Sequence, residues 1–259
     1  MSAFMSAFAS LVGSLADLLH PFFQSAATAA AIVLFTALVR LAVHPLSRAT
    51  ARGQKARTRI QPRVAELRKK HAKDPERLRK AVAELHAEEQ VSPLSGCLPS
   101  LLQMPAFFLL YHLFSSRDIG GEPNRLLGHQ LFDAPLGDRW HDALAHGGPF
   151  GAQGVVYLGL FAIVAAVATF NYGRTKRQLA ANPMTPVTGP DGETVPGMGA
   201  MSRLMPLMSF ATLFTVGVVP LAAALYVVTS TTWTAIERAV LYRDVHPAGT
   251  VVAAPTTAA

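Results

Sequence analysis

Apolar stretches long enough to cross a lipid bilayer constrain this 259-residue chain more than any other feature. A membrane-spanning helix needs about 20 mostly apolar residues. The stretches that approach this length are 26–46, 98–114, 154–171 and 204–236. The last is too long for one span and contains Pro220, which disrupts a helix, so we divide it into 204–219 and 221–240. The sequence therefore predicts an all-α membrane protein with five transmembrane helices, and a charged fraction of only 15% agrees with it.

The excess positive charge lies in one segment between the first two spans. Residues 48–90 hold 13 Lys and Arg against six acids, a net charge of +7, and the rest of the chain is neutral. Loops rich in Lys and Arg stay on the cytoplasmic side of a membrane. The loop at 172–203 carries four cations, whereas the loop at 115–153 carries three cations against five acids. This distribution predicts that the N-terminus lies outside and the C-terminus in the cytoplasm.

The basic segment 48–90 is predicted to form a cytoplasmic α-helical hairpin. Two narrow apolar stripes have helical spacing: Ile60, Val64 and Leu67, then Leu78, Val82 and Leu85. Asp74 is expected to cap the second helix, with Pro75 at its first position. Two interpretations stay open. The hairpin either contacts anionic lipids, as any positive loop can, or contacts a nascent chain, the ribosome or a targeting factor.

Both ends of the chain differ from the five-span core, which we place at 25–243. Residues 1–24 alternate apolar and serine faces at helical spacing, which predicts an amphipathic helix lying on the outer face of the membrane. The apolar side holds Phe4, Phe8, Leu11, Leu15, Leu18 and Phe22. Residues 244–259, mainly Ala, Thr and Pro, predict a disordered cytoplasmic tail.

Arg40 is the only charge within the clearest apolar stretches. A cation at mid-bilayer costs at least about 2.5 kcal/mol. Arg40 lies about six residues, or roughly 9 Å, from the cytoplasmic end of its span, and a long side chain can partly reach that far. It is therefore either a snorkelling residue or a charge in a water-filled cavity open to the cytoplasm. Thr36, one turn away on the same face, and the polar residues Gln103, Tyr226 and Ser230 of other spans are candidates to line such a cavity.

Signatures of an enzyme are lacking in the sequence. It has no paired spanning carboxylates, no HExxH zinc motif and no GxSxG nucleophile turn. The histidines lack the spacing of metal ligands, and Cys97 is the single cysteine. We expect no enzymatic activity, no metal and no cofactor.

Three segments in the expected order resemble the YidC family of membrane protein insertases. They are LFTALVRLAVHPLS (34–47), SPLSGCLPSLLQMPAFFLLYHLF (92–114) and MPLMSFATLFTVGVVPLAAALYVVTS (205–230). The matching positions are Arg40, Pro45, Leu46, Gly96, Cys97, Leu98, Pro99, Gln103, Pro105, Met205, Pro206, Pro220, Leu225, Tyr226 and Ser230. The resemblance extends over about residues 24–243 and is closest to the short, Gram-positive-like form.

The resemblance implies a hydrophilic groove between the five spans, open to the cytoplasm and to lipid. Arg40 would receive polar or acidic parts of a substrate, with Thr36 as its neighbour and Tyr226 as an aromatic lining residue. The implied function is that of an insertase and chaperone of the bacterial plasma membrane, which acts alone or with the Sec translocon. The implied partners are nascent membrane proteins, with the ribosome, the signal recognition particle machinery and anionic lipids as further candidates. No sequence-specific nucleic acid binding is expected.

Some positions depart from the family pattern, and two other functions stay open. Val227 stands where an aromatic residue is usual, Thr231 where asparagine is frequent, and Glu237 near a common glutamine. A small transporter or channel component would also have a polar bundle interior, and it predicts intramembrane acids or an inverted repeat. A lipid-bound ribosome tether would rest on the hairpin alone and predicts salt-dependent binding.

Overall fold

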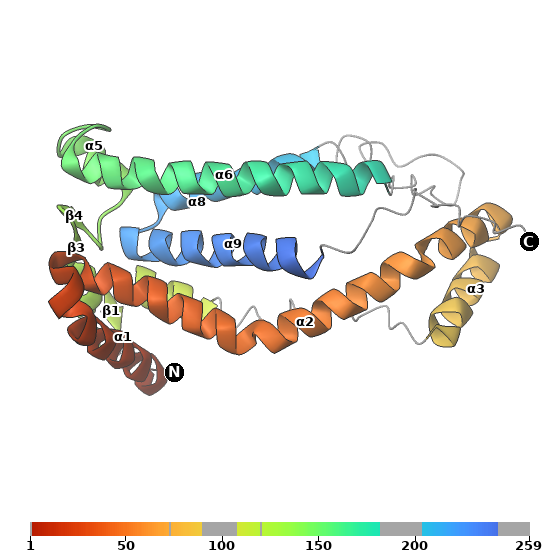
Figure 1. Ribbon diagram of the computed structural model, residues 1–259, viewed down its shortest axis with the longest axis horizontal. Coiled ribbons are helices and arrows are strands. Elements are labelled where there is room, and N and C mark those ends of the chain that lie inside the picture. Colours follow the sequence, from red (N-terminus) through yellow and green to blue (C-terminus); the bar gives the residue numbers. More distant parts are fainter. Residues whose placement is uncertain (1, 73, 90–107, 120, 182–203, 243–259) are drawn as a thin grey trace, which may run out of the picture. The chain divides into compact units, whose positions relative to one another are not determined.

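The computed structural model describes residues 2–72, 74–89, 108–119, 121–181 and 204–242, which are mostly helical (Figure 1). The helical class predicted from the sequence is confirmed. Within the described residues, two helical stretches are long and apolar enough to cross a membrane, Ser6–Lys70 and Ala152–Ala180, and Met205–Val218 is a shorter apolar one. The count of five spans stays a prediction.

The chain divides into two compact units, which are described separately. The first unit comprises residues 1–42 and 105–237, and the second comprises residues 43–104 and 238–259.

In the first unit, the N-terminal helix packs against the start of the next helix. Helix α1 spans Ser2–Phe23, and the short 3-10 helix η1 (Gln24–Ala26) leads into α2 (Ala27–Lys70). Val12 of α1 is fully buried, and the Phe8 ring meets the Phe35 ring edge-on with centroids 5.8 Å apart. A second apolar stripe stays exposed: Leu11 (57%), Leu18 (69%) and Phe22 (82%). The helix therefore has one apolar side against protein and another that is suited to lipid.

The start of the last helix forms the centre of the core. Helix α9 spans Leu221–Leu241, and all of residues 221–228 are buried. Val219 is extended (φ −85°, ψ 157°), because the residue before a proline is disfavoured in the helical region. This ends α8 (Ala211–Val218), and α9 begins directly after Pro220. Helix α6 (Ala152–Ala181) packs along α8 and the 3-10 helix η3 (Met205–Phe210).

The segment between the helix at 108–115 and α6 carries structure that the sequence analysis did not predict. It contains the two-stranded pair β1 (Asp118–Ile119) and β2 (Glu122–Pro123), the 3-10 helix η2 (Arg125–Gly128), the pair β3 (Gln130–Leu131) and β4 (Ala134–Pro135), and α5 (Trp140–Ala145). These strands have only two residues each, too few for a hydrophobic periodicity that a sequence could reveal.

This segment satisfies the buried N-terminus of α9. The first amides of a helix have no acceptor within the helix, and leaving them unpaired in an apolar interior is costly. The amide of Leu221 donates to the Asp138 carbonyl (2.8 Å), and that of Ala222 donates to the Leu136 carbonyl (2.9 Å). The Tyr157 hydroxyl of α6 also donates to the Asp138 carbonyl, at 2.6 Å. The segment thereby fixes α9 relative to α6.

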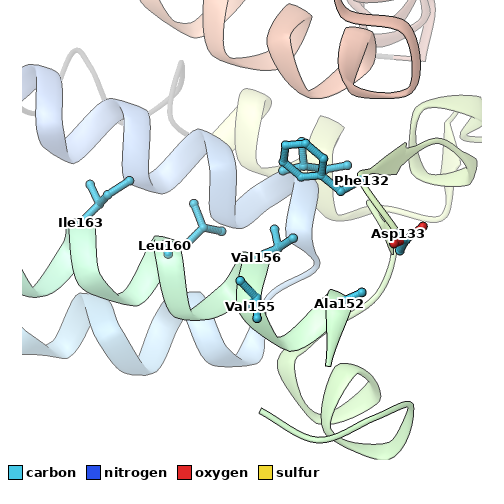
Figure 2. A pocket seen from close by; sticks show the side chains of 9 residues that line it. Phe132, Asp133, Ala152, Val155, Val156, Leu160 and Ile163 are labelled. Atoms are coloured by element: carbon cyan, nitrogen blue, oxygen red, sulfur yellow. The ribbon is translucent and has the colours of Figure 1, made fainter. Parts of the chain in front are cut away.

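An apolar pocket of about 550 Å³ lies between α6 and the turn that joins β3 to β4 (Figure 2). Phe132 occupies that turn with a left-handed φ of 54°, as the first central residue of a two-residue hairpin turn often does. Val155, Val156, Leu160 and Ile163 of α6 line the other side. None of the residues predicted to line the groove takes part, so we treat this pocket as separate from the candidate site.

The second unit contains the basic segment, which α2 enters without a break. We expected the first span to end near residue 46 and the hairpin to begin at 48; these bounds stay a prediction, and α2 is one helix that passes through Pro45 and Pro62. A residue before proline is a probable but not a certain helix boundary. The residues between these prolines include the strong helix formers Leu, Ala, Arg, Gln and Lys, which favour continuation.

The second helix of the hairpin is α3 (Pro75–Glu88). Its predicted cap is confirmed, because the Asp74 carboxylate accepts a hydrogen bond from the Arg77 amide at 3.0 Å. Ile60 of α2 and Leu85 of α3 are both 4% exposed, so the two apolar stripes are largely shielded. Arg63 forms an ion pair with Glu89, and the Tyr242 hydroxyl donates to Gln54 Oε1 at 2.6 Å.

Replacing Asn124 with Ala should destabilise the first unit. Its side chain, 7% exposed, donates to the carbonyls of Leu113 (2.9 Å) and Ser116 (3.0 Å) and accepts from the Leu126 amide (3.2 Å). Losing these buried bonds should cost about 2 kcal/mol and lower the melting temperature in detergent by about 4–8 °C. Gln130→Ala, on exposed β3, is the control. A melting temperature equal to that of the unchanged protein would contradict the structural role of Asn124.

Replacing Asp74 with Ala should loosen α3 locally. Removal of an N-cap typically costs about 1 kcal/mol. Amide hydrogen exchange over residues 75–80 should speed up by about fivefold, whereas exchange in α6 should not change. Asp74→Asn should restore most of the protection because an asparagine side chain also caps helices well. Equal exchange in Asp74→Ala and the unchanged protein would show that α3 does not depend on this cap.

Candidate functional site

Arg40 of α2 joins the last helix through a side-chain hydrogen bond. The Arg40 side chain is half-buried, and its Nη2 donates to Ser230 Oγ of α9. Ser230 is only 3% exposed, so the bond lies away from solvent. A hydrogen bond from a charged donor is roughly twice as strong as one between neutral groups. Two residues that the sequence analysis placed in different spans are therefore in direct contact.

Tyr226 lies one turn before Ser230 and belongs to the same cluster. A side-chain hydrogen bond connects Tyr226 with Ser230, the same residue that accepts the hydrogen bond from Arg40. The ring is almost completely buried and packs against Phe114, with centroids 5.9 Å apart and planes at 40°. We refer to Arg40, Tyr226 and Ser230 as the Arg40 cluster.

Thr36 lies one turn before Arg40 in α2, and its place in the groove stays a prediction. It is 1% exposed, and its hydroxyl donates to the carbonyl of Ile32 in its own helix at 2.7 Å. Its hydroxyl proton is therefore already engaged, whereas its oxygen can still accept a hydrogen bond. Gln103, the remaining predicted residue, lies outside the described residues, as do the motif positions 96–99 and 105.

Helix α9 carries other polar groups, of which the sequence analysis considered Thr231 and Thr232 but not Thr229, Trp233 or Thr234. The hydroxyls of Thr229, Thr231 and Thr234 donate hydrogen bonds to carbonyls of their own helix, each at 2.8 Å. Thr232 Oγ1 and Trp233 Nε1 are buried without a hydrogen-bond partner among the described residues. The Glu237 carboxylate interacts electrostatically with Arg40.

The spacing of Trp233 and Glu237 from Tyr226 in the sequence could have identified them as neighbours of the predicted site residues. From Tyr226, the residues Ser230, Trp233 and Glu237 follow at intervals of four, seven and eleven, which all lie on one face of an α-helix. This face of α9 therefore presents an aromatic hydroxyl, an aliphatic hydroxyl, an indole and a carboxylate in line. Arg40 approaches it from α2.

The Arg40 cluster can bind a polar or anionic group, but it has no arrangement for bond-making chemistry. It holds a permanent cation and neutral hydroxyls, with one carboxylate nearby, and no nucleophile paired with a base. Within the part of the chain that the structure describes, no group of three His, Cys, Asp or Glu side chains is placed to bind a metal ion.

Similar proteins agree with the motifs found in the sequence. The membrane protein insertase YidC of Clostridium perfringens is 44% identical over 84 residues, which is 32% of this chain and 35% of that protein. The YidC of Polynucleobacter asymbioticus is 38% identical over 101 residues, 39% of this chain and 18% of that protein. That of Alkalilimnicola ehrlichii is 42% identical over 81 residues, 31% of this chain and 14% of that protein. The matches thus span about a third of the first relative's length and less than a fifth of the other two.

The match to a family model covers far more of the chain than these pairwise similarities do. The family described as the 60Kd inner membrane protein matches residues 18–248, which include the Arg40 cluster, the basic hairpin and all the predicted spans. The resemblance seen in the sequence is confirmed, and the chain belongs to the 60Kd inner membrane protein family, the family of the YidC proteins.

Proposed function

We propose that this protein is a membrane protein insertase and chaperone of the bacterial plasma membrane. It receives nascent membrane proteins from the cytoplasm in a hydrophilic groove that contains the Arg40 cluster, and it releases their helices into the bilayer. The observation that carries this proposal is the half-buried Arg40, which lies in an apolar stretch of α2 and is hydrogen-bonded to a buried serine of α9. Membership of the family and the names of the similar proteins support the same function.

A polar segment crosses hydrocarbon at a high cost because each unpaired backbone or side-chain group loses its water. A groove with fixed polar groups shortens the hydrocarbon path and gives the crossing segment alternative partners. The guanidinium is suited to this task because it stays charged and presents five donors. The helix of the substrate is apolar, so its transfer from the groove into lipid is favourable. This transfer drives insertion without nucleotide hydrolysis.

The outer faces of the helices suit such a lateral release. Leu38 and Leu41 of α2 are 50% and 57% exposed, and Phe214 of α8 is 77% exposed. A protein surface in water rarely exposes so many large apolar side chains, whereas a surface that faces lipid can do so without cost. A substrate helix that leaves the groove would meet lipid next to side chains of this kind.

The basic hairpin would act on the cytoplasmic side before insertion. Its net charge of +7 attracts anionic lipid headgroups and acidic substrate segments. Among its described residues, only Ala51, Ile60 and Leu85 are buried apolar side chains, which is too few for a rigid domain core. We place the hairpin as a guide for incoming chains. The ribosome, the targeting machinery and the Sec translocon are the partners it would serve.

Replacing Arg40 with Ala should reduce insertion of a small membrane protein with an acidic outer tail by about tenfold or more. A hydrogen bond to a charged group contributes about 1.5–3 kcal/mol, and 1.4 kcal/mol corresponds to a factor of ten. The measurement is protease protection of the substrate's tail in proteoliposomes. Leu41→Ala, the neighbouring exposed residue on α2, is the control. Undiminished insertion of several acidic-tailed substrates by folded Arg40→Ala protein would contradict the proposed contact.

Deleting residues 56–88 should slow insertion without abolishing it, because the hairpin guides substrates while the Arg40 cluster receives them. Initial rates in proteoliposomes should fall several-fold, and the final inserted fraction should approach that of the full-length protein. A variant with Arg68, Lys69 and Lys70 replaced by Gln separates loss of charge from loss of the hairpin. Complete loss of insertion by deleted protein that is itself stably embedded would reverse the assigned roles.

A further inference from the structure

Glu237 shares one face of α9 with the groove residues. It follows Ser230 by seven residues, two turns of the helix, and its angular offset from Ser230 is only about 20°. A helical side chain leans toward the N-terminus of its own helix, so the carboxylate of Glu237 leans toward Ser230. Ser230 is the residue to which Arg40 donates its hydrogen bond.

The other charge of α9 is placed differently. Within Leu221–Leu241 only Glu237 and Arg238 are charged. Arg238 is exposed and rotated by about 100° from Glu237, away from the shared face. Glu237 is half-buried and is attracted to the Arg40 guanidinium. Of the two charged residues of α9, only Glu237 is thus directed toward Arg40, the side chain that is proposed to receive substrates.

We propose that Glu237 is a specificity-determining residue that competes with the acidic part of a substrate for Arg40. This inference rests on the proposed function, because it concerns the same groove. In the empty protein, Glu237 partly neutralises Arg40. An incoming aspartate or glutamate exchanges one carboxylate for another, so its net gain is smaller than that of binding to a lone guanidinium.

Such an exchange suits a site that must let its ligand go. Removing one partner of a buried ion pair is strongly unfavourable, because the remaining charge is left uncompensated. With Glu237 available, Arg40 keeps a counter-charge when the substrate leaves for the bilayer. Binding that is strong enough for entry and weak enough for exit is also what ion pathways require. Glu237 therefore lowers the affinity for acidic segments and speeds their release.

The test compares two peptides that share one apolar helix and carry either an acidic tail or its Asp-to-Asn, Glu-to-Gln equivalent. Their affinities for the full-length protein in lipid nanodiscs are measured by fluorescence anisotropy. Glu237→Gln, which removes the charge and keeps the shape, should raise the acidic-to-neutral affinity ratio by about three- to tenfold, the size expected for one partly screened charge. Asp133→Asn, an exposed acid in the turn between β3 and β4, removes the same charge elsewhere and should leave the ratio unchanged.

The Glu237→Gln substitution in an Arg40→Gln background decides whether Glu237 acts through Arg40. If the two carboxylates compete for Arg40, Glu237→Gln should no longer raise the acidic-to-neutral affinity ratio when Arg40 is absent. The two substitutions form a double-mutant cycle, which reveals the coupling of the two residues. An unchanged or lower ratio in Glu237→Gln, or a rise that persists without Arg40, would overturn the inference. Insertion of the neutral-tailed substrate by the unchanged protein reports on the proposed function separately. If that insertion fails, the proposed function is wrong, whereas the peptide affinities alone decide the role of Glu237.

Discussion

A guanidinium inside an apolar helix needs polar partners, and the arrangement of the first unit follows from how Arg40 obtains them. Ser230 accepts its hydrogen bond, Tyr226 shares Ser230 as a hydrogen-bond partner, and Glu237 adds electrostatic attraction. These partners all lie on one face of α9, so the rotation and height of α9 must be held with respect to α2. The segment at 118–145 contributes to this, because the carbonyls of Leu136 and Asp138 bind the first amides of α9. A segment between two predicted spans thus helps to set the register of this contact between helices.

This geometry suits the proposed contact with substrates better than it suits a reactive centre. The face of α9 that Arg40 approaches carries hydroxyls, an indole and one carboxylate, and each can exchange hydrogen bonds with water, with another side chain or with a passing polypeptide. On this face, Trp233 Nε1 has no hydrogen-bond partner among the described residues, so it offers a bond to a crossing polar segment. A site that binds weakly through several such groups tolerates many sequences, which a general insertase requires.

The sequence revealed the class and the exceptional residue, but not the contacts. Arg40 stood out because charge is costly in an apolar span, and long apolar runs with an uneven charge distribution indicated a helical membrane protein. The Asp74 cap was predictable because it depends on neighbours in sequence. The Arg40–Ser230 bond was not, because it depends on the register between two helices 190 residues apart in the chain. The continuity of α2 through Pro45 and Pro62 and the two-residue strands were missed for a similar reason, since tertiary context overrides local preference there.

The most direct test of the central claim is photo-crosslinking to nascent chains stalled on ribosomes at successive lengths. A photoreactive amino acid replaces Arg40 in one variant and the exposed Leu41 in another, which lies at almost the same depth on α2. We predict that crosslinks from position 40 appear as the first polar tail enters and fade as the apolar helix is released, whereas position 41 crosslinks mainly to lipid. Equal crosslinking of the nascent chain from both positions, or none from position 40 at any length, would contradict the claim that substrates pass through the Arg40 cluster.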